Sequence, residues 1–389
     1  MKILHTVEQY SPSVGGMQEV VKQLSERLVE LGHEVTVVTS YRSDRKFTEL
    51  NGVKIESFKV GGNAVRGYEG EIDEIKRYQS FLVNSDFDII TSFAAQQWAT
   101  DLLLPLMDQI SAKKVFVPTG FSGLYNPQYK YYFSQMGRWM KQYDLDVFLS
   151  NDYRDINFAR DNGVDKLLVI PNGASSEEFL GETDFDFRKE LEIDRDDFLV
   201  LLVGSHTGEK GHKEVIEIFS QANLERSTLV IIANTYRITC YLECRVRSII
   251  HNLLHQNKIL IKTLDRKKTV VAYKKSDLFL FPSNIECSPL VLFEAMASRL
   301  PFLTTDVGNS KEIIEWSQGG LLLPTRKDSR GYSYAQINES ADLLKKLHGD
   351  KELREKLAES GFKSWQEKFT WEKIAKNYEE QYKKLLGIL

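Results

Sequence analysis

Short apolar runs alternate with amphipathic segments along most of the chain. Runs of this kind are typical of parallel strands, which are covered on both faces and lack polar alternation. In the first half we expect strands at residues 3–6, 35–39, 53–58, 89–93, 114–117, 147–149 and 167–170. Helical patterns lie between most of them, at residues 15–31, 72–83, 98–110, 129–143 and 153–161. This βαβ rhythm predicts an α/β fold with a doubly wound parallel sheet, which binds ligands at the carboxyl ends of its strands.

The same rhythm starts again in the second half. The turn signal Pro171-Asn172-Gly173 leads into an acidic, irregular stretch at residues 175–197, where we place the linker. Further strands are expected at residues 198–203, 228–233, 258–262, 278–281, 302–304 and 320–324, and charged helices at 340–369 and 371–386. The sequence therefore predicts two Rossmann-like domains, residues 1–172 and 173–370, followed by a C-terminal helical segment, residues 371–389.

Composition narrows the classes of partner and compartment. The formal net charge of -4 argues against a nucleic-acid partner, so local donors have to hold any anionic substrate. The cysteines Cys240, Cys244 and Cys287 form no even disulfide framework, and no signal-peptide pattern opens the chain, which favours a reducing cytoplasm. No apolar run approaches the roughly 20 residues that span a bilayer, so we do not expect an integral membrane protein.

The strongest chemical pattern is the run from Phe281 to Ala297. Glu286 is expected in a loop after a strand, and Glu294 lies eight positions later, inside a helix that Pro289 can begin. Eight helical steps would separate the carboxylates by about 12 Å. Because the paired carboxyls of most glycosidases lie only roughly 5 to 9.5 Å apart, a hydrolase dyad is disfavoured. One elongated ligand fits better, such as a nucleotide sugar with its sugar and ribose hydroxyls near the two carboxylates.

The backbone around this run can receive the phosphates of such a ligand. A helix N-terminus offers free N–H groups and the positive end of a dipole. Proline at 289 has no N–H, so the contacts are expected from the amides of Ser288, Leu290 and Val291. For Glu294, a salt-bridged or solvent-facing carboxylate is the alternative interpretation.

Two glycine-containing loops follow strands and suit close approach to a ligand. One contains Gly204, Ser205, His206 and Lys210, and its lysine would meet a diphosphate. The other contains the pair Gly15-Gly16 between the first strand and the first helix. For each loop the alternative is an ordinary turn with no bound ligand.

Together these segments resemble the retaining glycosyltransferases of family 4, which have the GT-B fold and an E-x7-E motif carried here by Glu286 and Glu294. The resemblance implies an acceptor domain and a donor domain that face each other across a cleft, with the last helix crossing back to the first domain. It implies transfer of a sugar from a nucleotide donor to an acceptor hydroxyl with retention, with Lys210 and Glu286 as the catalytic residues, and with no cofactor or metal. Gly15, Gly16 and the two loops around Lys210 and Glu286 would hold the donor.

The chain departs from the family pattern at several positions. Ser205 stands where an arginine is usual, so His206 or His212 becomes a candidate second donor to the phosphates. The histidine often found after the fifth strand is missing, and Thr119, Gly120 and Tyr125 are the candidate acceptor contacts there.

Residues 129–143 carry aromatic and methionine side chains at helical spacing. A core-facing stripe is the favoured interpretation. Basic neighbours leave an interfacial helix as the alternative, which would place the protein peripherally at the inner face of the membrane.

Other sites and activities are disfavoured. His251 and His255 lack the Glu of H-E-x-x-H, and Cys240 and Cys244 lack a second ligand pair, so no metal site is expected. No dinucleotide or P-loop fingerprint follows a strand. The remaining alternatives are a GT-B-like epimerase or phosphorylase, and a non-catalytic nucleotide-sugar-binding subunit of a glycosyltransferase complex. Surface polysaccharide, glycolipid or glycoprotein glycan synthesis is the expected role, while the base, sugar and acceptor are left open.

Overall fold

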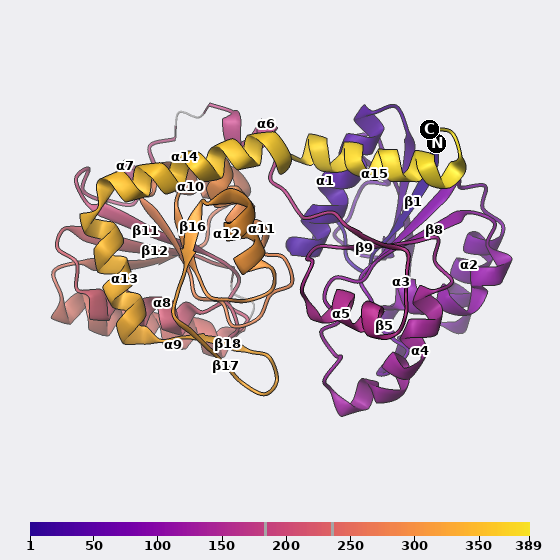
Figure 1. The fold of residues 1–389 in the computed structure, drawn as a ribbon, viewed down its shortest axis with the longest axis horizontal. Helices are drawn as coiled ribbons and strands as arrows, with labels where there is room; N and C mark the ends of the chain where they lie inside the picture. The colour runs from indigo at the N-terminus through magenta and orange to yellow at the C-terminus, as the bar shows by residue number, and fades with distance from the viewer. Residues whose placement is uncertain (183–184, 235–236) are drawn as a thin grey trace. The chain divides into compact units, whose positions relative to one another are not determined.

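The computed structural model describes residues 1–182, 185–234 and 237–389 (Figure 1). The chain divides into two compact units. The first contains Met1–Asn172 and Trp371–Leu389, and the second contains Gly173–Thr370. The division thus falls within the Pro-Asn-Gly turn and again just before the last helix.

The first unit is built on an eight-stranded sheet with the order β10-β9-β8-β7-β1-β2-β4-β3. All neighbouring strands are parallel except β3 and β4. The bounds are β1 (Lys2–Thr6), β2 (Glu34–Ser40), β3 (Glu49–Leu50), β4 (Val53–Phe58), β7 (Ile89–Phe93), β8 (Lys113–Val117), β9 (Leu145–Phe148) and β10 (Leu167–Val169). A separate hairpin joins β5 (Gly61–Asn63) to β6 (Gly67–Glu69).

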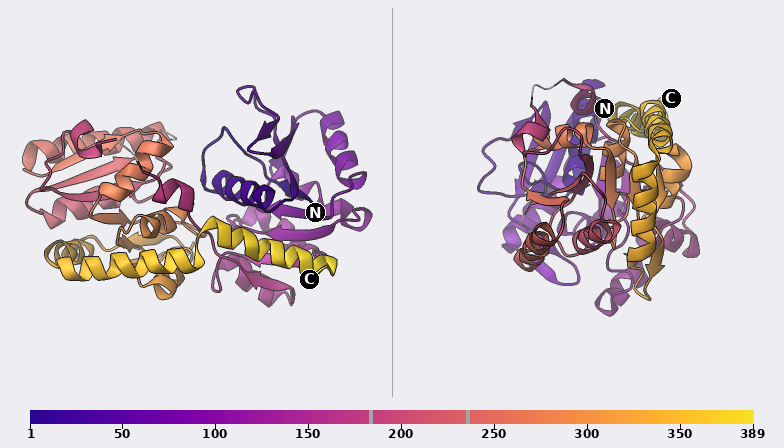
Figure 2. Two further views of the ribbon diagram at one scale, coloured as in Figure 1. Left: turned by 90° about the horizontal axis from the view of Figure 1, so that it is seen from above. Right: turned by 90° about the vertical axis from the view of Figure 1, so that its left-hand side faces the viewer.

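The helices of the first unit come from both ends of the chain. They are α1 (Gly16–Glu30), α2 (Ile72–Val83), α3 (Trp98–Asp101), α4 (Lys130–Met140), α5 (Arg154–Asp161) and α15 (Trp371–Leu386), with 3-10 turns η1 (Leu104–Gln109) and η2 (Pro127–Tyr129). The last helix, α15, runs beside α1 (Figures 1 and 2). Arg27 Nε donates to Glu372 Oε1 at 3.1 Å, and the Thr91 and Tyr382 hydroxyls lie 2.7 Å apart. These contacts attach the C-terminal segment to the first sheet.

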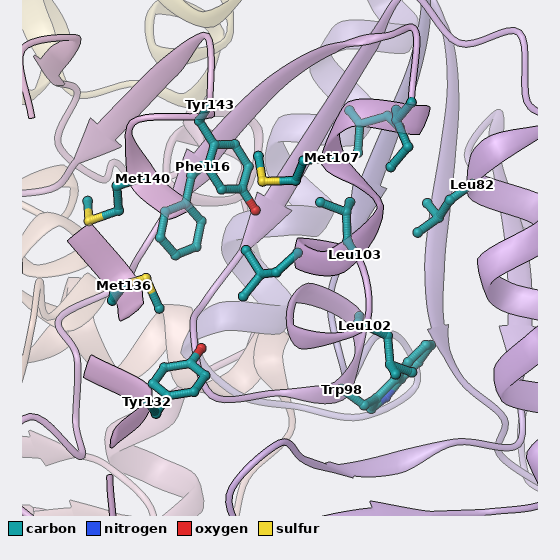
Figure 3. Close-up of a cluster of buried hydrophobic side chains, with 14 of the residues drawn as sticks. Leu82, Trp98, Leu102, Leu103, Met107, Phe116, Tyr132, Met136, Met140 and Tyr143 are labelled. Atoms are coloured by element: carbon teal, nitrogen blue, oxygen red, sulfur yellow. The ribbon is translucent and has the colours of Figure 1, made fainter. Parts of the chain in front are cut away.

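The aromatic and methionine stripe at residues 129–143 packs into the core of the first unit. Its six members are all buried: Tyr129, Tyr132, Phe133, Met136, Met140 and Tyr143. Figure 3 shows several of them near Phe116 of β8, and Trp98 of α3 belongs to the same buried cluster. The core-facing interpretation is therefore confirmed, and the stripe is not available as an interfacial membrane helix. Among the described residues, no helix combines the length and apolar character needed to cross a membrane.

The second unit is built on a six-stranded parallel sheet with the order β13-β12-β11-β14-β15-β16. The bounds are β11 (Phe198–Val203), β12 (Ser227–Ile232), β13 (Lys258–Lys262), β14 (Leu278–Phe281), β15 (Phe302–Thr304) and β16 (Gly320–Leu322). A short antiparallel hairpin joins β17 (Thr325–Lys327) to β18 (Ser333–Ala335).

Helices cover both faces of this sheet. They are α6 (Ser176–Leu180), α7 (Phe187–Glu190), α8 (His212–Ala222), α9 (Ile238–Leu254), α10 (Arg266–Lys275), α11 (Leu290–Ala297), α12 (Ser310–Ser317), α13 (Ile337–Gly349) and α14 (Lys351–Lys368). Along β11, Leu199 and Leu201 belong to one buried cluster, whereas Val200 and Leu202 belong to another. Because successive side chains of a strand point to opposite faces, the two clusters are the cores of a doubly wound sheet.

Three predicted elements differ from the structure. The charged helix expected at residues 340–369 is divided at Asp350 into α13 and α14. The expected helix at residues 98–110 is split into α3 and η1, with Pro105 at the start of the 3-10 turn. The expected linker at 175–197 instead contains α6 and α7, and its Phe179 and Phe187 are buried in the core of the second unit. The many acidic residues of the stretch suggested an exposed linker, so the burial of these two phenylalanines was not predicted. Residues 183 and 184 of the stretch lie outside the described residues.

Candidate functional site

The strand order of the second unit reverses between β11 and β14. From β11 the chain builds outward through β12 and β13, then returns to place β14 on the other side of β11. Open α/β sheets bind ligands outside the carboxyl ends of the strands at such a reversal. The loop after β11, residues 204–211, and the loop after β14, residues 282–289, both begin at this point. The two loops contain six of the predicted donor-binding residues: Gly204, Ser205, His206, Lys210, Glu286 and Ser288. The other three of this unit, Leu290, Val291 and Glu294, follow in α11.

The two loops are joined by hydrogen bonds and a very close backbone approach. The Asn284 N–H donates to the Glu209 carbonyl at 2.8 Å, and Ser283 Oγ lies 3.1 Å from the same oxygen. Gly211 has a φ of +70°, and a Cβ there would lie 2.1 Å from the Pro282 carbonyl oxygen. Only glycine accommodates both the left-handed backbone and this contact.

We therefore expect Gly211→Ala to lower the free energy of unfolding more than Gly208→Ala, its matched control in the same loop. Both positions have left-handed backbone, which costs a residue with a Cβ about 1 to 2 kcal/mol. At Gly208 the nearest atom to an added Cβ belongs to the flexible Arg237 side chain, at 3.2 Å. Gly211→Ala should lose a further 1 to 3 kcal/mol or so through overpacking against backbone. Urea unfolding measures both variants, and equal losses would contradict the close approach.

Lys210 and Glu286 meet where the two loops come together. Lys210 Nζ lies 2.7 Å from Glu286 Oε1. Ser283 Oγ lies 2.8 Å from the same carboxylate oxygen, and its one hydroxyl hydrogen is donated either to this oxygen or to the Glu209 carbonyl. The side chain of Lys210 is 29% exposed and that of Glu286 is 11% exposed. Gly204 and Ser205 are half-buried at the start of the same loop. The structure thus brings the two predicted catalytic residues into one ion pair, which their separation of 76 positions did not reveal.

Glu294 is buried and already has a charged partner. Its side chain is 7% exposed, and Arg266 Nη1 donates to its Oε1 at 2.6 Å. The same guanidinium also contacts Glu178, with Nη2 and Oε2 2.6 Å apart. Burial, followed by the charge of Glu294, raises the pKa of Tyr273 well above its usual range. The salt-bridged alternative for Glu294 is therefore what the structure contains.

The helix that carries Glu294 begins one residue later than expected. Pro289 occupies the N-cap with extended backbone, and α11 starts at Leu290. The first-turn N–H groups of an α-helix have no acceptor within the helix. Leu290, Val291 and the preceding Ser288 are half-buried, so this end of the helix is not sealed by the core. Ser288 Oγ accepts a hydrogen bond from Asn309 Nδ2 at 3.1 Å.

Neither His206 nor His212, the first residue of α8, presents its ring to solvent. His206 is fully buried, with its ring beside Cys240 and Tyr241, and His212 is 2% exposed. His212 Nε2 lies 2.9 Å from the Gly204 carbonyl oxygen. Burial lowers the pKa of His206 and lowers that of His212 to about 3. Both rings are therefore neutral near pH 7, and neither supplies the positive charge of the missing arginine.

The first unit has a reversal of its own between β1 and β7. Gly15 precedes α1 and Gly16 begins it, at the end of the loop that follows β1. After β7, Ala94 and Gln96 have φ values of +64° and +61°. Residues with a Cβ are held in left-handed backbone only where surrounding contacts require it, and such residues cluster at binding sites. This edge of the first sheet is thus a second candidate ligand region.

The predicted acceptor residues lie beside it, after β8. Thr119 has a φ of +60° and is half-buried. The Gly120 N–H donates to Asp155 Oδ2 at 2.7 Å, so it is engaged inside the protein. Tyr125 is 63% exposed, with the Arg154 guanidinium 5.3 Å from its ring centroid.

Comparisons with known proteins agree with this architecture. Residues 14–178 match the family model described as Glycosyltransferase Family 4, and residues 183–364 match the model described as Glycosyl transferases group 1. The chain belongs to the family 4 glycosyltransferases. An uncharacterized glycosyltransferase of Methanocaldococcus jannaschii is 24% identical, with 98% of each chain covered.

Solved structures place the glycosyltransferase in the GT-B fold. The sucrose-phosphate synthase of Thermosynechococcus elongatus has a TM-score of 0.79 at 16% identity, with 100% of both chains covered. Anabaena HepE, solved in complex with UDP-glucose, has a TM-score of 0.74 at 15% identity, also with 100% of both chains covered. The predicted family and fold class are thereby confirmed.

The buried Asp155 makes the stability of this glycosyltransferase depend on pH. Burial raises the pKa of Asp155 to about 6 from 3.8, although N–H groups of Gly120 and Ile156 oppose the shift. A carboxyl whose pKa is higher in the folded state stabilises the fold below its unfolded pKa, and this contribution disappears as the pH rises through the folded pKa.

We therefore expect wild type to gain about 1 to 1.5 kcal/mol of unfolding free energy relative to Asp155→Asn between pH 7 and pH 5. Asparagine retains an oxygen for the Gly120 N–H but does not titrate. Asp161→Asn, which changes an exposed carboxyl on the same helix, is the control and should leave the pH dependence as in wild type. Urea unfolding at both pH values tests this, and a constant difference between wild type and Asp155→Asn would contradict it.

The sequence assigned no role to the side chains of two arginines near the candidate site. Arg266 begins α10 and binds Glu294, and Arg237 precedes α9 beside Gly208. Neither stands in a recognisable motif. The only available signal was position, because Arg266 follows β13 and Arg237 follows β12 at the carboxyl edge of the sheet.

Proposed function

We propose that this glycosyltransferase takes its sugar from a nucleoside diphosphate donor bound to the second unit, outside the carboxyl ends of β11 and β14. The observation that carries the proposal is the Lys210–Glu286 pair, with Nζ and Oε1 2.7 Å apart at the reversal of the sheet. The similarity to HepE, solved with UDP-glucose, supports a donor of this class. We propose that transfer proceeds with retention of the anomeric configuration.

Breaking the bond between sugar and diphosphate leaves negative charge on the diphosphate. Groups that contact this charge accelerate the reaction when they bind the transition state more tightly than the ground state. Lys210 would supply an ammonium, while Ser288, Leu290 and Val291 lie at the N-terminus of α11, where N–H groups and the helix dipole favour anions. We propose that these groups serve in place of a catalytic metal ion.

A second positive charge can come from Arg237. The family arginine is replaced by Ser205, and both histidines of this region are neutral. Arg237 is exposed, and its Nη1 would lie 3.2 Å from a Cβ built on Gly208. Arg237 lies in the connection between β12 and α9, and its guanidinium therefore approaches the loop at residues 204–211.

The two carboxylates would then act at the ends of the donor. When a diphosphate draws Lys210 away, we expect Glu286 to accept hydrogen bonds from hydroxyls of the transferred sugar. Glu294 would accept hydrogen bonds from the ribose while Arg266 continues to neutralise its charge. Gly15 and Gly16 stay predicted donor contacts, and Thr119, Gly120 and Tyr125 stay predicted acceptor contacts. The acceptor class, which we expect to be a glycan, glycolipid or glycoprotein, and the cytoplasmic location likewise stay predictions.

A thermal-shift panel of nucleotide sugars, without added divalent cations, tests the donor. A donor at 100 times its dissociation constant should stabilise the protein by about 2.7 kcal/mol. The nucleotide sugar with the largest shift is then assayed for transfer to glycan and lipid-linked acceptors, with the anomeric product determined by NMR. Formation of an epimerised sugar without any acceptor, seen in the same NMR spectra, would indicate an epimerase. Binding without turnover would indicate a non-catalytic subunit, and no binding to any nucleotide sugar would refute the proposal.

A further inference from the structure

Two thiols and one imidazole lie close together where the first loop of the second unit, residues 204–211, meets α9. His206, Cys240 and Cys244 each offer a ligand atom, and these atoms all lie within 4.8 Å of one another. His206 follows β11, whereas the two cysteines lie on α9. His206 and Cys244 are buried and Cys240 is half-buried. The cluster therefore spans from the loop at residues 204–211 to α9.

Helical spacing brings the two thiols together. Residues four positions apart lie one above the other on the same face of an α-helix. Cys240 Sγ lies 3.5 Å from His206 Nδ1, so the third ligand already faces this pair. The sequence alone showed only two cysteines without a second ligand pair, because the histidine is 34 positions away.

Two further ring nitrogens lie near the cluster. Within the described part of the chain, His206 Nε2 and His212 Nδ1 are buried without a hydrogen-bond partner. The two rings lie 4.2 Å apart between centroids. Neither of these two nitrogens is His206 Nδ1, the nitrogen that faces Cys240, so the candidate site is defined by the three clustered ligand atoms.

We propose that His206, Cys240 and Cys244 bind a transition-metal ion of the Zn²⁺ class. Two sulfur ligands and one imidazole nitrogen match the preference of Zn²⁺, whereas Mg²⁺ and Ca²⁺ take oxygen ligands. On binding, the two thiols lose their protons to solvent and form metal–sulfur bonds. The two thiolate charges then offset the ion, so the buried assembly carries no net charge. A fourth position stays open for water.

The ion would hold the loop at residues 204–211 against α9. The Arg237 N–H donates to the His206 carbonyl oxygen at 2.7 Å, and the His206 N–H donates to the Asn234 carbonyl oxygen at 3.1 Å. A metal bound to the His206 ring would add a third contact, made by the side chain, to these two backbone hydrogen bonds. None of the three ligands is Lys210 or Glu286, so the ion would attach the loop to α9 without replacing either of these residues. Any effect on donor binding rests on the proposed function, but metal binding itself does not.

Cobalt titration tests the site directly. The reduced, chelator-treated protein is titrated with Co²⁺, and absorption from thiolate-to-cobalt charge transfer is recorded. We expect one equivalent to bind, with the intensity of a tetrahedral thiolate site, and Zn²⁺ to displace it. The full chain is used, and circular dichroism checks that the treated protein is folded. Folded protein without this absorption would overturn the proposal.

Variants assign the ligands. Cys240→Ala, at the half-buried position, should weaken Co²⁺ binding by about 100-fold or more, because even the loss of a residue that only supports a ligand costs roughly 10- to 100-fold. His206→Asn should do the same. Cys287→Ala removes the cysteine outside the cluster and should retain the absorption. Zn²⁺ should raise the Tm of wild type and of Cys287→Ala but not of Cys240→Ala, even if that variant is less stable. An equal loss of cobalt absorption in Cys287→Ala would overturn the assignment. The nucleotide-sugar panel, run on metal-free protein, tests the donor site separately.

Discussion

Lys210→Met should lower kcat about 100- to 1,000-fold, the usual effect of removing one group that stabilises developing negative charge. Methionine keeps an unbranched side chain of similar length but has no ammonium. The charge that forms on the departing diphosphate would then lack its nearest cation. KM for the donor should change less than kcat, because the interaction is strongest in the transition state. Steady-state kinetics with the donor identified by the thermal-shift panel measure both constants.

The control is Lys213→Met, which makes the same chemical change at an exposed position in the first turn of α8. It should leave kcat within about twofold of wild type, since surface substitutions away from a site have small effects. Thermal unfolding of both variants checks that they are folded. A Lys210→Met enzyme with wild-type kcat would rule out the proposed role of this lysine.

Glu294→Gln should raise KM for the donor about 10- to 100-fold, with a smaller change in kcat. A hydrogen bond to a charged group contributes about 1.5 to 3 kcal/mol, and the amide accepts more weakly than the carboxylate. The ribose lies away from the bond that breaks, so its loss affects binding more than chemistry. Donor titrations and kinetics together separate these effects.

The ion pair with Arg266 offers a purely structural explanation for Glu294, and Glu178→Gln distinguishes the two. Glu178 contacts the same guanidinium from the other side, so this variant disturbs Arg266 while leaving the Glu294 carboxylate in place. If Glu294 binds the ribose, only Glu294→Gln should raise KM. If it acts only by holding Arg266, Glu294→Gln should lower the unfolding free energy and leave KM unchanged, which would remove Glu294 from the donor site.

Most secondary structure was predictable because local pattern and burial agree. The apolar run predicted at 198–203 is β11, and the run predicted at 278–281 is β14. The helix predicted at 98–110 failed because its apolar spacing continues through Pro105, whereas the backbone changes there from α3 to a 3-10 turn. The predicted linker at residues 175–197 was wrong for a different reason, because composition and not spacing misled the prediction. Its acidic residues suggested exposure, while Phe179 and Phe187 decide its packing.

The partners of the charged residues could not be predicted in the same way. A salt-bridged carboxylate was one of the interpretations of Glu294, and the structure supplies Arg266 as its partner from a different strand-to-helix connection. Likewise, Lys210 and Glu286 were recognised separately but not as a pair. Which charges meet depends on how the strands are ordered in the sheet, and no local pattern encodes that order.

The sequence by itself determined the βαβ rhythm, the two-part organisation and the loops that carry the candidate chemistry, because hydrophobic periodicity and turn residues act over short distances along the chain. Only the tertiary structure decided that β11 and β14 are neighbours, that Lys210 faces Glu286, and that His206 joins Cys240 and Cys244. Those arrangements arise when strands far apart in sequence pair in one sheet and bring the connections at their carboxyl ends together.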